Sequence, residues 1–115
     1  MNKLAKYTGL AYNYQTYNCW HHVRAVRRDA GIDTPEFDCR TPELIEASRK
    51  QTKGMVKIEN PEPYCAVLMY TKREKWHAGV YLDGLISHCD RNARQVRIDT
   101  LKSINKIAER VEFWR

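Results

Sequence analysis

The sequence contains no Cys-X-X-Cys pair, although four cysteines are present. They are spread along the chain, at Cys19, Cys39, Cys65 and Cys89. Dithiol redox motifs and zinc ribbons both need two cysteines that are close in sequence, so this spacing argues against both kinds of site. We expect Cys39, Cys65 and Cys89 to be structural thiols.

Long apolar runs are also missing, and no segment approaches the roughly 20 apolar residues that a membrane-spanning helix needs. Residues 1–7 are polar and basic and lack the apolar core of a secretory signal. We therefore expect a chain without a membrane span that is made in the cytoplasm, where thiols stay reduced. Repeats, low-complexity segments and linkers are absent as well, which indicates a single domain over residues 1–115.

The positive charge is not concentrated in one segment. The chain has 20 Lys and Arg against 14 Asp and Glu, a net charge of +6, but no long run of like charges. Sequence-specific nucleic-acid binding is typically marked by clustered basic residues in a recognisable motif. We therefore expect a solvated basic surface that suits an anionic polymer, and no specific nucleic-acid partner.

The first strong local pattern is an amphipathic helix that begins at Cys19. Asn18 is a good N-cap, and Gly31 is a good C-terminal stop. Val23 and Val26 follow Cys19 at helical spacing, so all three side chains lie on the apolar face. The thiol is therefore expected to face the rest of the domain.

The remaining segments change from helical to extended patterns. A second helix is predicted for residues 42–51, because Thr41 is a good N-cap and Pro42 fits the first helical position. Strands are predicted at residues 64–70, 77–82, 85–89, 94–98 and 110–114, with a short helix or turn at 100–105. This order indicates the α+β class, with N-terminal helices packed on an antiparallel β-sheet.

Two histidines are brought together by a predicted hairpin. The pair Asp83-Gly84 lies between two apolar runs and is typical of a two-residue turn. In that register Gly79 lies opposite His88, and alternation places His77 on the same face. The two imidazoles are then diagonal neighbours, and Gly79 leaves open space opposite His88.

These residues suggest covalent catalysis by a thiol. The positive end of a helix dipole stabilises a thiolate at Cys19, which favours its use as a nucleophile. We predict that Cys19 attacks, that His77 takes its proton, and that His88 fixes the tautomer of His77. The pKa of Cys19 is then expected well below the ordinary thiol value of about 8.5.

The motif Tyr-Asn-Cys-Trp around Cys19, the segment His-Ala-Gly-Val-Tyr-Leu at 77–82, and His88 resemble those of the NlpC-like cysteine peptidases. These are papain-like enzymes that cut bacterial peptidoglycan, and the short chain with its closing Val-Glu-Phe-Trp-Arg looks most like phage and prophage members. The resemblance assigns the nucleophile, base and orienting residue to Cys19, His77 and His88. It also implies an upstream tyrosine that helps the Cys19 N–H to hold the oxyanion, with Tyr12 the best match and Tyr7 second.

The resemblance further implies a papain-like NlpC-type domain that hydrolyses an amide bond of peptidoglycan stem peptides, without a cofactor or metal. It favours a phage tail as the route to the cell wall, with tail proteins as partners. Two other roles fit the same residues: a non-catalytic virion assembly module, and another thiol enzyme such as an acyltransferase or a peptidase acting on a protein precursor.

A zinc site is the remaining alternative for the same side chains. Cys19, His22, His77 and His88 are residue types that could together give tetrahedral ligation. The helical wheel, however, places His21 towards solvent and His22 at the edge of the buried stripe. We therefore expect His21 to be a solvated surface residue, and His22 to be a packed histidine or one that supports a site residue.

Overall fold

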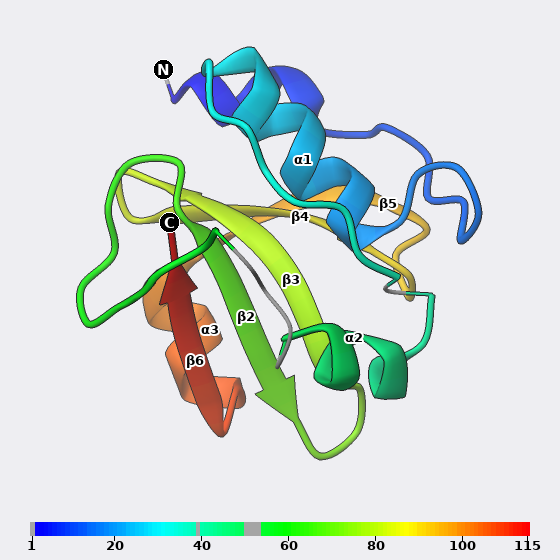
Figure 1. The fold of residues 1–115 in the computed structure, drawn as a ribbon. Helices are drawn as coiled ribbons and strands as arrows, with labels where there is room; N and C mark the ends of the chain where they lie inside the picture. Colours follow the sequence, from blue (N-terminus) through cyan, green and yellow to red (C-terminus); the bar gives the residue numbers. More distant parts are fainter. Residues whose placement is uncertain (1, 39, 50–53) are drawn as a thin grey trace.

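A computed structural model describes residues 2–38, 40–49 and 54–115. Within these residues an antiparallel sheet of six strands is flanked by helices, an α+β arrangement (Figure 1). The helical elements are η1 (Lys3–Tyr7, a 3-10 helix), α1 (Cys19–Asp29), α2 (Pro42–Arg49) and α3 (Leu101–Ile107). The strands are β1 (Lys57–Ile58), β2 (Ala66–Thr71), β3 (Lys75–Leu82), β4 (Leu85–Asp90), β5 (Gln95–Thr100) and β6 (Arg110–Trp114).

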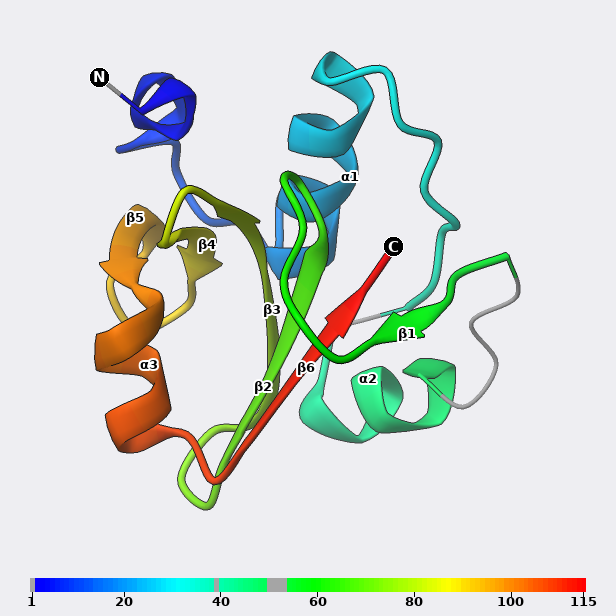
Figure 2. The ribbon, with the colours of Figure 1, turned by 90° about the vertical axis from the view of Figure 1, so that its left-hand side faces the viewer.

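The sheet separates two hydrophobic cores. Its strand order is β1-β6-β2-β3-β4-β5, with α1 and α2 on one face and α3 on the other (Figure 2). Val23 and Val26 of α1 pack with Val80 in the first core, and Ile104 of α3 packs with Ile86 in the second. The predicted packing of N-terminal helices on an antiparallel sheet is thus confirmed, with an additional helix on the far face.

Helix α1 begins at Cys19, as the sequence predicts, because Asn18 caps its first turn. The Asn18 side chain accepts hydrogen bonds from the N–H groups of Trp20 and His21, at 3.1 and 3.2 Å. In return, His21 Nδ1 accepts a bond of 3.1 Å from the Asn18 N–H, which completes a capping box. The half-exposed His21 therefore stabilises the helix start that positions Cys19.

The β3–β4 hairpin has the predicted turn and register. Asp83 and Gly84 have φ values of 50° and 82°, as a two-residue turn of the mirror-image type requires. The observed partners are Leu82 with Leu85, Tyr81 with Ile86 and Val80 with Ser87. The faces predicted for His77 and His88 follow from this register.

Other boundaries differ from the predictions for local reasons. Tyr64 adopts a left-handed φ of 64°, so β2 begins only at Ala66. Arg94 adopts a φ of 60°, so β5 begins at Gln95. The strand continues to Thr100, beyond the predicted end at Ile98. Elements η1 and β1 were not predicted, and the predicted helix end near residue 51 lies outside the described residues.

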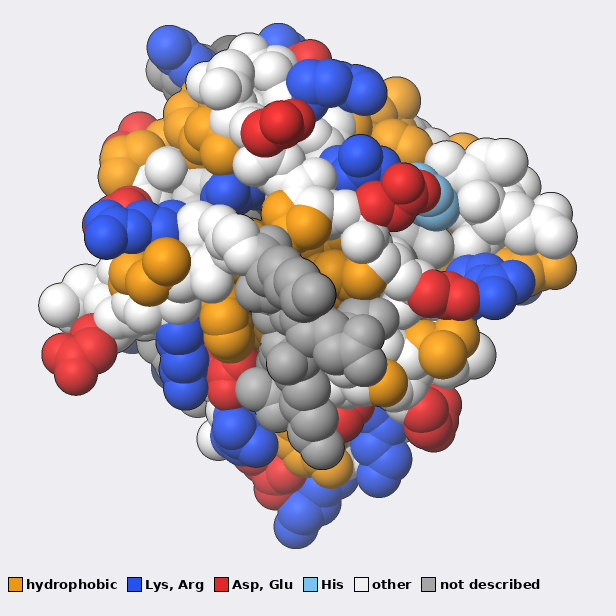
Figure 3. Space-filling view, viewed as in Figure 1, with side chains coloured by type: hydrophobic (Ala, Val, Ile, Leu, Met, Phe, Trp, Pro, Cys, Tyr) orange, Lys and Arg blue, Asp and Glu red, His pale blue; other side chains and the backbone are white. Residues whose placement is uncertain are grey.

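Charged side chains are mixed on the surface. Figure 3 shows lysine and arginine interspersed with aspartate and glutamate over the face that it displays, rather than gathered into one basic patch. In the described part of the chain, no helix has both the length and the apolar character needed to cross a membrane.

Candidate active site

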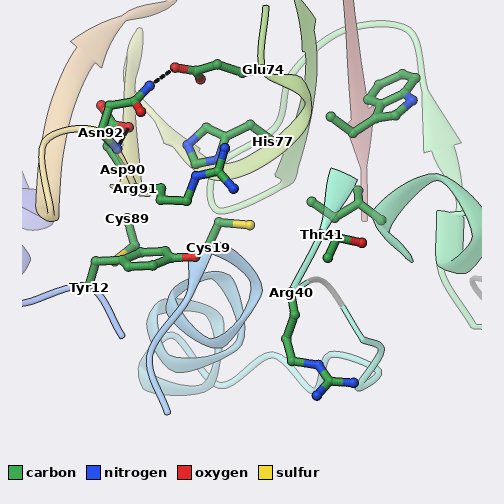
Figure 4. Close-up of a pocket in the computed structure, with 12 residues that line it drawn as sticks. Tyr12, Cys19, Arg40, Thr41, Glu74, His77, Cys89, Asp90, Arg91 and Asn92 are labelled. Carbon is green, nitrogen blue, oxygen red and sulfur yellow. Dashed lines mark hydrogen bonds between the residues drawn. The ribbon is translucent and has the colours of Figure 1, made fainter. Parts of the chain in front are cut away.

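Cys19 and His77 line one small pocket, although they come from different layers of the fold (Figure 4). Cys19 is the first residue of α1 and is 5% exposed, whereas His77 lies on β3. The pocket measures ≈ 40 Å³ and opens at the surface. The pocket therefore has room for only a small group beside the sulfur.

A series of hydrogen bonds continues from His77 across two further strands. His77 Nε2 lies 2.9 Å from His88 Nδ1, and His88 Nε2 lies 2.7 Å from Asp99 Oδ2. His77 also lines a second pocket, beneath α3, together with His88 and Asp99. The series thus connects the pocket of Cys19 with the opposite side of the sheet.

The proton positions in this series follow from Asp99. Although burial raises the pKa of this carboxyl, its bonds to His88 and Arg97 lower it more, so it is ionised and only accepts hydrogen bonds. Burial and the nearby charge of His77 lower the pKa of His88 to about 4, so His88 is neutral. His88 therefore donates from Nε2 and accepts at Nδ1. His77 must then donate from Nε2, which leaves its Nδ1 for the thiol.

The interaction between Cys19 and His77 favours the charged imidazole. Burial alone lowers the pKa of His77, but a hydrogen bond to Cys19 and the negative charge of its thiolate raise it by more, and the net shift is upward. This combination is typical of a thiolate–imidazolium pair. The arrangement can supply both a nucleophile and a proton donor.

Tyr12 lies in the pocket, and its ring points towards Cys19 (Figure 4). The Tyr12 N–H donates to the Arg94 carbonyl at 3.0 Å, and the Val96 N–H donates to the Leu10 carbonyl at 2.8 Å. These bonds hold the segment before α1 against β5. Tyr7, the second choice from the sequence, instead donates its hydroxyl to Asp29 at 2.6 Å and does not line the pocket.

His22 is fully buried and has both ring nitrogens engaged. Its Nδ1 lies 2.8 Å from the Tyr17 hydroxyl, and its Nε2 lies 2.8 Å from Ser87 Oγ. This is the packed role that the sequence predicts, and it does not fit the alternative of a zinc ligand. Within residues 2–38, 40–49 and 54–115, no group of three or more His, Cys, Asp or Glu side chains is arranged to hold a metal ion.

The other described cysteines differ from Cys19 in their surroundings. Cys65 and Cys89 are buried free thiols, and burial raises the pKa of both. Cys89 also lines the pocket, but its thiol donates to the Tyr17 carbonyl at 3.5 Å, and its pKa is raised to about 12. It therefore stays protonated, whereas Cys19 has a base. Cys39 lies outside the described residues.

Asp99 is the site residue that the sequence analysis missed. The predicted strand ended at Ile98, so Asp99 was assigned to no face of the sheet. In the structure His88 lies opposite Arg97 and Ile86 lies opposite Asp99, which makes His88 and Asp99 diagonal neighbours on one face. The signal was the alternation of Arg97 and Asp99, which becomes visible only when the strand extends to Thr100.

No protein-family model matches this chain, and no curated protein sequence is significantly similar to it.

Proposed function

We propose that this chain is a papain-like cysteine peptidase of the NlpC type that hydrolyses an amide bond in peptidoglycan stem peptides. The observation that carries the proposal is the hydrogen-bonded series from His77 through His88 to Asp99, with Cys19 at its open end. A thiol, a base and an orienting group in this order are what nucleophilic catalysis by cysteine needs.

In the acylation step the Cys19 thiolate attacks the carbonyl carbon of the scissile amide. The developing oxyanion is held by the Cys19 N–H, at the positive end of α1, and by the Tyr12 hydroxyl. His77 then transfers the proton on Nδ1 to the leaving nitrogen, the C–N bond breaks, and a thioester with Cys19 remains.

In the deacylation step His77 acts as a base. It takes a proton from water, which attacks the thioester, and the acid leaves as the Cys19 thiolate is restored. His88 keeps the proton of His77 on Nε2 throughout, so that Nδ1 always faces the reacting atoms. Asp99 stabilises the positive charge that forms on His77, acting through His88.

The substrate class comes from the resemblance of the motifs around Cys19, His77 and His88, and the chemistry of the site is compatible with it. A net charge of +6 favours contact with an anionic cell wall. Association with a phage tail is part of the same proposal, because it would bring the site to the wall.

Digestion of purified peptidoglycan, followed by mass spectrometry of the fragments, tests the proposal. The wild-type chain is expected to release fragments with a new amine and a new carboxyl group, and Cys19→Ser is expected to release none. Cys65→Ala is the matched control, because Cys65 is a buried thiol that does not line the pocket. If the folded wild-type chain, with a reactive Cys19, leaves peptidoglycan intact, the proposed substrate is wrong. Transfer of the acyl group to an added amine instead of water would favour an acyltransferase.

A further inference from the structure

Arg91 lines the pocket of Cys19 and His77 but has no part in the reaction steps above. It lies in the turn that follows β4, and Figure 4 shows its side chain extending over the pocket on the side of His77. Asp90 Oδ1 accepts a bond of 3.0 Å from the Asn92 N–H, which closes a small turn around Arg91. The turn fixes the backbone from which this side chain reaches the pocket.

The two arginines of the pocket differ in their partners. The Arg40 guanidinium binds the Asp38 carboxylate, with Nε–Oδ1 and Nη2–Oδ2 distances of 3.0 and 2.7 Å. Arg91 is exposed, and among the residues that the structure describes it has no hydrogen bond or ion pair from its side chain. Arg40 is thus neutralised within the protein, whereas the charge of Arg91 is directed to whatever occupies the pocket.

The acidic residues that line the same pocket are held by other groups. Asp90 lies 3.7 Å from the Arg97 guanidinium, and Glu74 accepts a hydrogen bond from Asn92. Because these carboxylates have other partners, they leave the Arg91 guanidinium uncompensated at the mouth of a pocket that contains Cys19 and His77. A guanidinium in such a place pairs well with a carboxylate, because its planar fork can donate two parallel hydrogen bonds.

We propose that Arg91 binds a carboxylate of the substrate close to the scissile amide, and so selects peptides that carry a free acidic group at that position. The inference rests on the proposed function, since it assumes that the pocket binds the reacting amide. It assigns Arg91 to substrate selection, and it leaves the reaction steps to Cys19, His77 and the residues behind them.

Two alkylating reagents test this without knowledge of the natural substrate. Iodoacetate carries a carboxylate next to its reacting carbon, and iodoacetamide is its neutral counterpart. The rate of Cys19 alkylation by each is followed by mass spectrometry, and the ratio of the two rates is the measured quantity. Arg91→Gln is expected to lower the iodoacetate-to-iodoacetamide ratio by about 5-fold, the size of one charge pair at roughly 4 Å in water. The effect should shrink at high salt.

Arg28→Gln removes the same charge from an exposed position at the far end of α1 and is expected to keep the wild-type ratio. Arg91→Lys should retain most of the ratio, because it keeps the charge while losing the fork. If Arg91 has only a structural role, Arg91→Gln should change the rates of alkylation by both reagents equally. An unchanged ratio in Arg91→Gln would overturn the inference while leaving the peptidase proposal intact. If Cys19 of the wild-type chain fails to react even with iodoacetamide, the proposed function itself is wrong.

A pair of synthetic peptides extends the test to hydrolysis. The two differ only in glutamate or glutamine next to the scissile bond. Wild type is expected to prefer the glutamate peptide in kcat/KM, and Arg91→Gln to lose that preference by about the same 5-fold. Equal losses on both peptides would contradict carboxylate recognition.

Discussion

His88 Nε2 lies 2.7 Å from Asp99 Oδ2, and this bond determines which nitrogen of His77 is available to Cys19. Arg97 Nε lies 3.1 Å from the same carboxylate oxygen, which keeps Asp99 in place. A neutral imidazole behind a base stabilises a developing positive charge less well than a carboxylate does. In this chain the carboxylate is supplied one residue further along the series, and two hydrogen bonds, His77 to His88 and His88 to Asp99, connect it to the base.

We expect Asp99→Asn to lower kcat/KM roughly 10- to 100-fold. The amide N–H₂ of the introduced asparagine can donate to His88 Nε2, which would move the His88 proton to Nδ1 and force the His77 proton onto the nitrogen that faces Cys19. The base would then have no lone pair for the thiol. Peptide hydrolysis measures the loss, and Asp33→Asn, at an exposed position outside the pocket, is the control. Wild-type activity in folded Asp99→Asn would show that Asp99 does not position the base.

The raised pKa of His77 predicts a pH profile for Cys19. If the thiolate favours the imidazolium, the imidazolium favours the thiolate to the same extent, because the two titrations are coupled. We expect iodoacetamide to alkylate Cys19 rapidly at pH values well below the ordinary thiol pKa of about 8.5. His77→Asn should shift the profile upward by at least about one pH unit, whereas Asp33→Asn, at an exposed position outside the pocket, should not. Identical profiles for wild type and His77→Asn would argue against the pair.

The parts of the site that were predictable from sequence depend on local rules. Asn18 specifies where α1 begins, and the Asp83-Gly84 turn fixes the pairing of β3 with β4. Once the pairing is known, the alternation of side chains places His77 and His88 on one face. The helix start, the hairpin pairing and the shared face of the two histidines can each be predicted from residues close in sequence and from the type of turn.

Asp99 and Tyr12 were harder to place because their positions depend on long-range pairing. Strand β5 continues to Thr100, and its pairing with β4 makes Asp99 a diagonal neighbour of His88. The role of Tyr12 came from the family resemblance, and its position is fixed by a backbone hydrogen bond to Arg94. Strand β1 was missed for a similar reason, since its two residues are extended only because they pair with β6.

Gly79 is expected to tolerate no side chain. A Cβ at this position would lie 2.8 Å from Ile86 Cγ2, 3.0 Å from the Ser87 carbonyl oxygen and 3.1 Å from His88 Cβ. Gly79→Ala should therefore push β4 away from β3, lower the free energy of unfolding by about 1–3 kcal/mol, and reduce activity further by displacing His88. Urea unfolding and peptide hydrolysis measure the two effects.

The double variant Gly79→Ala with Ile86→Leu is the matched test of this explanation. Leucine lacks the branch at Cβ that makes the closest contact, so part of the lost stability should return. The contact with the Ser87 carbonyl remains, and the rescue should be incomplete. A single Gly79→Ala variant as stable and active as wild type would mean that the hairpin relaxes without moving His88.

The lowered pKa of His22 predicts how the free energy of unfolding depends on pH. Burial, followed by the nearby charges of His88 and His77, lowers the pKa of His22 to about 4 in the folded chain, whereas the unfolded value is about 6.5. Between these two values the unfolded chain binds more protons, so the free energy of unfolding falls as the pH is lowered through this window. The full contribution of His22 to the free energy of unfolding is present above about pH 6.5. By about pH 4 this contribution is lost, and the loss amounts to roughly 3 kcal/mol at most.

Replacing His22 by glutamine should therefore lower stability at pH 7, because Tyr17 and Ser87 lose a well-placed partner, and should also weaken the fall between about pH 6.5 and pH 4. Val23→Ala is the control, since Val23 is fully buried on the same helix and does not titrate. The Val23→Ala variant should have a free energy of unfolding about 1–3 kcal/mol lower at every pH. Its dependence on pH should be that of the wild type, which His22 and His88 both contribute to. Urea unfolding at a series of pH values separates the two variants. Parallel curves for His22→Gln and Val23→Ala would mean that His22 does not lose its charge on folding.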